Sequence, residues 1–204
     1  MKPSLFAAVL GGLFAAATAQ AALVIDIDQV GPDVVATMSG SIDMTDLVNT
    51  HQPSGNFSTG FMESGGDFLD MQSVGVGNGN IFAGITGPAT FGTDTTGAVA
   101  SSSTGGSFDL EYAAEPIFFL PDSYMSGNSL SGTDTWAGTT LAQLGLTPGA
   151  SFTYSWGSNA DADSLQINIG PASQSVPEPA SLAMLAAGLT TLGMIRRRRA
   201  RQRR

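Results

Sequence analysis

Residues 23–28, Leu-Val-Ile-Asp-Ile-Asp, decide the fold class of this chain. Apolar side chains occupy every second position, which is the pattern of a β-strand with one buried face and one acidic face. A turn is predicted at Gly31-Pro32-Asp33, and residues 34–44 have the composition of a second strand. The two segments together predict a β-hairpin.

Short strands separated by turns are predicted through the rest of residues 22–175. Gly, Ser, Thr and Asp are abundant there, and the aromatic and β-branched residues are scattered singly, which favours strands over helices. Further strands are predicted at residues 56–62, 68–76, 80–86, 107–113, 115–120, 133–137, 151–157 and 164–169. We therefore expect one all-β domain with the architecture of a β-sandwich or a jelly-roll.

Residues 139–146 interrupt this pattern. Apolar residues recur at Leu141, Leu144 and Leu146, and Thr139 or Thr140 precedes them as a candidate cap. The stop signal Thr147-Pro148-Gly149 follows. One or two helical turns are therefore predicted here.

Charge is divided sharply along the chain. The 204 residues include 8 basic and 17 acidic side chains, and the formal net charge is −9. Apart from Lys2, the basic residues begin at Arg196, so residues 22–175 contain no Lys or Arg. Phosphate and nucleic-acid binding depend on such residues, and we expect cations or neutral molecules as ligands instead. The chain also has no Cys, which excludes thiol catalysis and disulfides.

The first 21 residues have the features of a secretory signal peptide. Lys2 precedes an apolar run over residues 5–17, and Ala19-Gln20-Ala21 follows. A positive start, a hydrophobic stretch and small residues are the three parts of such a signal. A retained anchor is the alternative, but the apolar run is short for a membrane span. We expect signal peptidase to cleave after Ala21.

Three features follow one another after the β domain, in residues 176–204. Val176-Pro177-Glu178-Pro179 comes first, then the uncharged segment 181–195, then Arg196, Arg197, Arg198 and Arg199. The two prolines favour an extended backbone that presents Glu178 to an enzyme. A helix over residues 181–195 would be about 22 Å long, which is marginal for about 30 Å of hydrocarbon. The arginines would remain cytoplasmic, which places the β domain outside.

This arrangement resembles the PEP-CTERM sorting signal of exported bacterial proteins. Residues 120–169 also resemble the body of many PEP-CTERM proteins of unassigned function. The resemblance implies a Gram-negative host and processing by a membrane-embedded exosortase, for which Pro177, Glu178 and Pro179 are substrate residues and not catalytic ones. A plain tail anchor with a proline hinge is the alternative.

The resemblance also implies a location and a set of partners. The chain would pass through an inner-membrane intermediate and reach the cell surface or the extracellular matrix. Such proteins are associated with exopolysaccharide and biofilm. The leading prediction is therefore an exported structural or adhesive protein without enzymatic activity and without nucleic-acid partners.

Two other functions remain open. A secreted glycan hydrolase would need a pair of carboxylates, for example Asp67 with Asp70 or Glu111 with Glu115. Histidine-dependent catalysis has only His51 available, which we interpret as a loop residue. Because no catalytic motif is present, we expect no enzyme.

A calcium- or neutral-carbohydrate-binding module is the other alternative. Asn159, Asp161 and Asp163 place oxygen ligands at alternate positions, as in the first half of an EF-hand loop. Ser164 and Gly170 replace the glycine and the glutamate of the second half, so a polar turn is the simpler interpretation. No other cofactor is expected.

An aromatic strand face could serve as a platform for sugars. Phe152, Tyr154 and Trp156 share one face of their predicted strand, and sugar rings stack on aromatic rings. We favour a core position, because a small sandwich needs such bulk in its centre.

Overall fold

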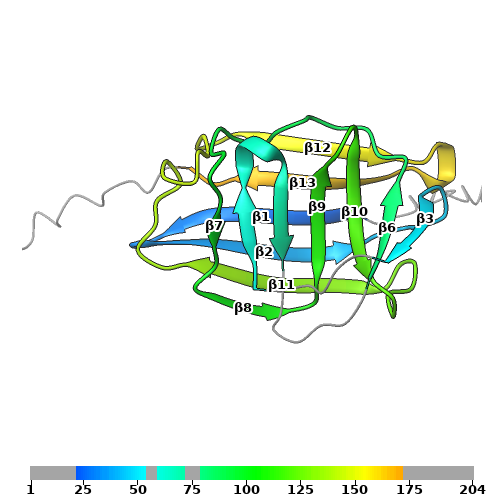
Figure 1. Cartoon of the computed structure of the whole chain (residues 1–204), viewed down its shortest axis with the longest axis horizontal. Coiled ribbons are helices and arrows are strands. Elements are labelled where there is room, and N and C mark those ends of the chain that lie inside the picture. Colours follow the sequence, from blue (N-terminus) through cyan, green and yellow to red (C-terminus); the bar gives the residue numbers. More distant parts are fainter. Residues whose placement is uncertain (1–21, 54–58, 72–78, 172–204) are drawn as a thin grey trace, which may run out of the picture.

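The computed structural model describes residues 22–53, 59–71 and 79–171, whose strands form two packed β-sheets (Figure 1). Sheet A has the order β12 (Ser151–Trp156), β13 (Asp163–Ile169), β1 (Ala22–Val30), β2 (Asp33–Ser41), β11 (Ser129–Trp136) and β8 (Ser102–Gly105). Sheet B has the order β3 (Val48–Pro53), β6 (Gly79–Ala83), β10 (Pro116–Pro121), β9 (Phe108–Tyr112), β5 (Phe68–Met71), β4 (Phe61–Glu63) and β7 (Ala98–Val99). Two short 3-10 helices are described, η1 (Ser64–Gly66) and η2 (Asn159–Asp161).

Sheet A is built around β1, the strand that the alternating pattern predicts. β1 pairs with β2 in antiparallel fashion, with Ile25 opposite Met38, and with β13 in parallel fashion, with Ile25 opposite Ile167. All three of these side chains are buried. The first and the last described strands therefore lie side by side in the middle of one sheet.

Sheet B carries shorter strands with the same alternation. Phe108 and Leu110 of β9 are fully buried, and so is Leu69 of β5, which lies opposite Leu110. Because side chains alternate between faces, the residues between them point to the other face of the sheet. Asp70 of β5 and Asp109 of β9 occupy these positions and lie directly opposite each other.

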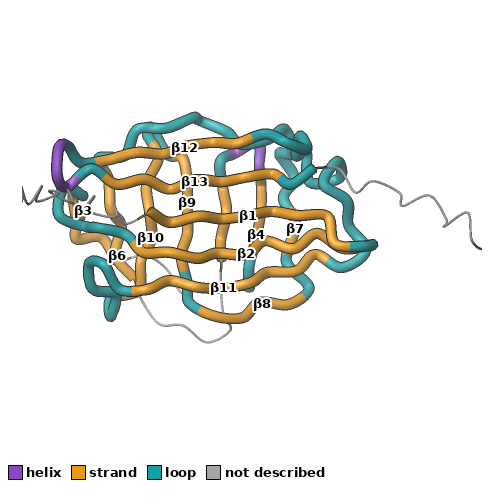
Figure 2. The backbone as a smooth tube through the Cα atoms, turned by 180° about the vertical axis from the view of Figure 1, so that it is seen from behind, coloured by secondary structure: helices purple, strands orange, loops and turns teal. Residues whose placement is uncertain are grey.

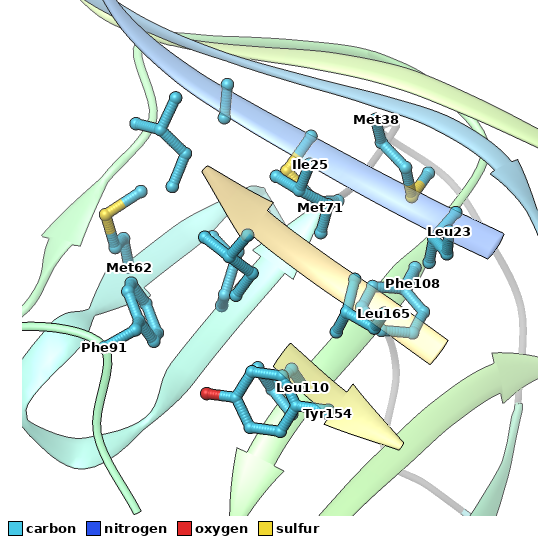
Figure 3. Close-up of a cluster of buried hydrophobic side chains, with 14 of the residues drawn as sticks. Leu23, Ile25, Met38, Met62, Met71, Phe91, Phe108, Leu110, Tyr154 and Leu165 are labelled. Atoms are coloured by element: carbon cyan, nitrogen blue, oxygen red, sulfur yellow. The ribbon is translucent and has the colours of Figure 1, made fainter. Parts of the chain in front are cut away.

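The strands of the two sheets cross at a steep angle. Sheet A runs lengthwise in Figure 1, sheet B runs across it, and Figure 2 shows the same crossing from behind. The core lies between the sheets, where Leu23, Ile25 and Leu165 of sheet A pack near Phe108 and Leu110 of sheet B (Figure 3). This is the orthogonal form of sheet packing.

The all-β prediction is confirmed, and the errors concern boundaries and polar segments. β3, β7 and β8 were not predicted, because they consist largely of polar or small residues or contain only two residues. His51 lies in β3 and not in a loop. Parts of two predicted strands, at residues 56–62 and 68–76, lie outside the described residues.

The helical turns predicted at residues 139–146 are reduced to a single α-type hydrogen bond, from Leu144 N to the carbonyl of Thr140 at 3.2 Å, and no regular helix forms. Residues 141–145 form turns, and Gly145 has a left-handed φ of 66°. Thr140 and Gln143 nevertheless bond as in a capping box: Thr140 N donates to Gln143 Oε1 at 2.8 Å, and Gln143 N donates to Thr140 Oγ1 at 3.3 Å. Burial of Leu141, Leu144 and Leu146 holds the segment against the core.

Candidate functional site

The predicted sorting residues lie outside the described part of the chain. This applies to Pro177, Glu178 and Pro179, to the segment 181–195 and to the arginines that follow. It applies also to the predicted signal peptide. Among the described residues, no helix is long and apolar enough to cross a membrane.

The chemistry inside the described domain is dominated by buried carboxyl groups. Five aspartates are at most 8% exposed: Asp67, Asp70, Asp109, Asp134 and Asp163. Burial of a charge without a partner costs several kcal/mol, typically more than a single hydrogen bond returns. The contacts of these groups therefore determine what the domain can do.

Asp67 links the two sheets across the core. It follows η1 with a left-handed φ of 53°, immediately before β5, and its side chain is fully buried. The hydroxyl of Tyr154, from β12 of sheet A, donates a hydrogen bond to Asp67 Oδ1, whereas Asp67 Oδ2 has no hydrogen-bond partner. Burial raises the pKa of Asp67 to about 6, and the bond from Tyr154 opposes this rise. Burial raises the pKa of Tyr154, and the negative charge of Asp67 and the hydrogen bond to it add to this rise.

Asp70 and Asp109 form a pair of buried carboxyl groups that bond to each other. Asp70 Oδ1 is buried and accepts no hydrogen bond, and Ser107 Oγ, two positions before Asp109, is also buried without a partner. Burial is the main cause that raises the pKa of Asp70 to about 9, and the negative charges of Asp109, Glu111 and Asp134 add to it. Both effects favour the protonated form of Asp70.

The Asn159–Asp163 segment is tied to the rest of the domain through Asp163. Asp163 accepts backbone hydrogen bonds from Asp43 N at Oδ2 and from Ser164 N at Oδ1, both at 2.7 Å. Asn159 and Asp161 belong to η2, and Asn159 has a left-handed φ of 56°. Within the described ranges, no group of three or more His, Asp or Glu side chains is arranged to hold a metal ion. Calcium binding stays a prediction.

A hydroxyl-lined trough of about 370 Å³ lies on sheet A where β2, β11 and β8 are neighbours. Thr37, Thr133 and Thr104 form one row across these strands, because Thr133 pairs with both of the others. The lining carries no charged side chain: Thr37, Met38, Ser39, Thr104, Gly105, Ser131, Gly132 and Thr133. Such a surface can exchange hydrogen bonds with a neutral ligand.

The aromatic strand face belongs to the core, as favoured from the sequence. Tyr154 is fully buried, Trp156 is 3% exposed, and Phe152 packs against the core. Trp156 packs edge-on against Phe118, and its Nε1 donates to the carbonyl of Asp43 at 2.7 Å. These rings are therefore not an exposed sugar platform.

Asp67 and Asp70, considered as one possible carboxyl pair from the sequence, have different hydrogen-bond partners in the structure. Asp67 bonds to Tyr154, and Asp70 bonds to Asp109. Asp109 and Asp134 were not singled out from the sequence. In the sequence, Asp109 stands between Phe108 and Leu110, which indicates that its side chain points away from the core. This pattern does not indicate that the opposite face of the sheet is shielded from water.

Comparison with known proteins identifies the targeting signal and not the β domain. Residues 175–199 match the family model of the PEP-CTERM protein-sorting motif. A search of the curated proteins and of the solved structures finds no match to the chain.

The class of the protein follows from the β domain and the sorting motif together. An all-β domain of two sheets precedes a sorting motif, which defines an exported protein with a membrane-anchored sorting signal. Residues 175–199 of this chain carry a PEP-CTERM protein-sorting motif, which indicates an exosortase-targeted exported protein.

Proposed function

We propose that the chain is a non-enzymatic structural component of the cell surface or of the exopolysaccharide and biofilm matrix. Signal peptidase removes residues 1–21, the segment 181–195 holds the chain in the inner membrane, and an exosortase then reads Pro177, Glu178 and Pro179. Arg196–Arg199 keep the end of the chain on the cytoplasmic side of that membrane. The match of the sorting motif to residues 175–199 is the observation that carries this proposal.

The buried acids support a structural role for the domain. A retaining glycosidase holds its carboxyl groups about 5 Å apart and an inverting one holds them farther apart, in both cases with access for the substrate. Asp70 and Asp109 instead bond directly to each other and are only 7% and 8% exposed. This arrangement favours a role in the fold over acid–base catalysis.

The experiment follows the chain in its own cells by mass spectrometry of the mature protein. We expect a new terminus near Pro177–Pro179, and Arg196–Arg204 absent from the surface or matrix fraction. Glu178→Ala should leave the full tail in the inner-membrane fraction. The exposed Glu115→Gln is the matched control and should be processed normally. An intact tail on wild-type protein in the matrix would contradict exosortase processing and indicate a permanent anchor.

Binding of neutral polysaccharide is a second function, favoured by the hydroxyl-lined trough. Thr37, Thr104 and Thr133 lie in one row whose hydroxyl groups can exchange hydrogen bonds with sugar hydroxyls, and Asp26 of β1 lies opposite Thr37 at the end of this row. Thr133→Val keeps the shape of the side chain and removes the hydroxyl. It should weaken retention on neutral glycans, whereas Thr153→Val, on the exposed surface of β12, should not. Equal retention of both variants would exclude the trough as the binding surface.

A further inference from the structure

Two buried carboxyl groups lie at β5, and each has one oxygen without a hydrogen-bond partner. Asp67 immediately precedes β5 and Asp70 lies within it. Asp67 Oδ2 and Asp70 Oδ1 are both buried and accept no hydrogen bond. Their side chains are 0% and 7% exposed, so water does not replace the missing partner at the surface.

The contact between Asp70 and Asp109 requires a proton. Two ionised carboxylates can only accept hydrogen bonds, so the bond between these groups exists only when one of them is protonated. The negative charges of Glu111 on β9 and Asp134 on β11 also act on Asp70 and raise its pKa further. Loss of the shared proton would convert an attraction into a repulsion inside the protein.

No basic side chain can take the place of this proton. Residues 22–175 contain no Lys or Arg, and His51, the only histidine, lies in β3 at the far edge of sheet B from β5. The group that contacts Asp67 is Tyr154, which donates its hydroxyl proton but carries no positive charge. Within the domain, the negative charges of Asp67 and Asp70 can therefore be neutralised by protons but not by a basic side chain.

We propose that folding of the β domain takes up protons at Asp67 and at the Asp70–Asp109 pair. The stability of the domain then depends on pH: it is higher in acid and falls toward alkaline pH. The proposal concerns the stability of the exported domain and is independent of how the tail is processed. It gives the buried acids a function that an apolar core of the same volume would lack.

The direction of the effect follows from proton linkage. Burial raises the pKa of Asp70 from 3.8 to about 9 and that of Asp67 from 3.8 to about 6. Above pH 3.8 the unfolded chain releases protons that the folded chain keeps, so stability falls as pH rises until each folded pKa is passed. Between about pH 5 and pH 8, the unfolding constant should rise about a thousandfold through Asp70 and about tenfold through Asp67.

The first test measures unfolding of the full chain in a mild detergent. Trp136 and Trp156, 1% and 3% exposed, report unfolding through their fluorescence. Urea titrations at several pH values between about 5 and 8 should show the unfolding constant rising steeply with pH. Asp70→Asn should remove most of this dependence, Asp67→Asn a smaller part, and the exposed Glu115→Gln none. His51→Gln is measured as well, because histidine ordinarily titrates in this range.

The second test needs no variant to fold. Infrared spectroscopy of the native full chain detects the carbonyl stretch of a protonated carboxylic acid. We expect one such group to persist at neutral pH and to vanish above about pH 9, and a second to appear below about pH 6. A native spectrum without a protonated carboxyl at neutral pH would overturn the proposal. So would an unfolding constant that stays the same across the pH range.

Discussion

Strand β1 and the β5–β9 pair handle the same residue type in opposite ways. Asp26 and Asp28 of β1 alternate with buried isoleucines and face water, whereas Asp70 and Asp109 alternate with buried residues and are themselves buried. In both places alternation turns the acid away from the core. The difference is whether the outer face of the sheet is open, and this decides whether an aspartate is a solubilising charge or a carboxyl group that keeps a proton.

The strongest test of this comparison places an acid on the wrong face of β1. Ile25→Asp would bury a carboxylate among Met38 and Ile167, which offer it no hydrogen bond, and would also remove a fully buried apolar side chain. We expect a loss of more than about 4 kcal/mol in the free energy of unfolding, measured by urea titration near neutral pH. Val24→Asp, on the other face of the strand, is the control, with an expected change within about 1 kcal/mol. Similar losses in the two variants would show that the faces of β1 do not differ.

A smaller effect is expected at the contact between the sheets. Tyr154→Phe removes the hydroxyl that donates to Asp67 Oδ1. Asp67 Oδ1 then loses this hydrogen bond, and Asp67 Oδ2 already has none. Because the bond lowers the pKa of Asp67, its loss raises that pKa above about 6. The stability lost should be about 1–3 kcal/mol at pH 8 and smaller near pH 4.5, where the carboxyl is protonated in both proteins.

The control for this contact is Tyr112→Phe, on β9 and only half-buried. It should change stability little at either pH. Thermal melts of both variants at the two pH values provide the measurement. A loss in Tyr154→Phe that is the same at both pH values would mean that the hydroxyl acts through packing and not through the charge of Asp67.

The sequence predicts the fold where the pattern of burial is local. Leu23, Ile25 and Ile27 determine which face of β1 is buried, and the turn after Val30 determines its pairing with β2. β8 carries no such pattern, because Ser102–Gly105 is polar and small and joins sheet A only through its pairing with β11. The parallel contact of β1 with β13 joins residues about 140 positions apart, which no local pattern indicates.

The buried acids were less predictable than the strands for a related reason. Asp67 and Asp70 were considered as a pair because they are close in sequence, yet each finds its partner on another strand, at Tyr154 and at Asp109. Cross-strand partners depend on register, and register is a property of the assembled sheet. The sorting motif needs no partner in the fold, and it was predictable from consecutive residues.

A modest effect is expected at a hydrogen bond far from both groups of acids. Thr140→Ala removes the hydroxyl that accepts from Gln143 N and leaves the reciprocal bond from Thr140 N to Gln143 Oε1 in place. We expect a loss of about 1 kcal/mol that does not vary with pH, measured by urea titration. Thr139→Ala, whose hydroxyl donates only a 3.4 Å bond to the carbonyl of Ala137, should cost less. A pH-dependent loss in Thr140→Ala would show that pH sensitivity is not confined to the buried acids.

The smallest effect should come from salt, which distinguishes the two kinds of acid directly. Exposed carboxylates such as Asp26 and Asp28 repel one another without any basic residue between them, and about 0.1 M salt screens charges beyond about 10 Å. We expect moderate salt or millimolar calcium to raise the melting midpoint of the full chain by about 2–4 °C. Asp26→Asn should reduce this gain, whereas Asp70→Asn should leave it unchanged, because ions in solution do not reach a buried pair.

Magnesium at the same concentration is the control: a larger shift with calcium alone would indicate a specific site, for which the Asn159–Asp163 segment is the first candidate. Unchanged midpoints in every salt would contradict the idea that repulsion among exposed acids limits the stability of this domain.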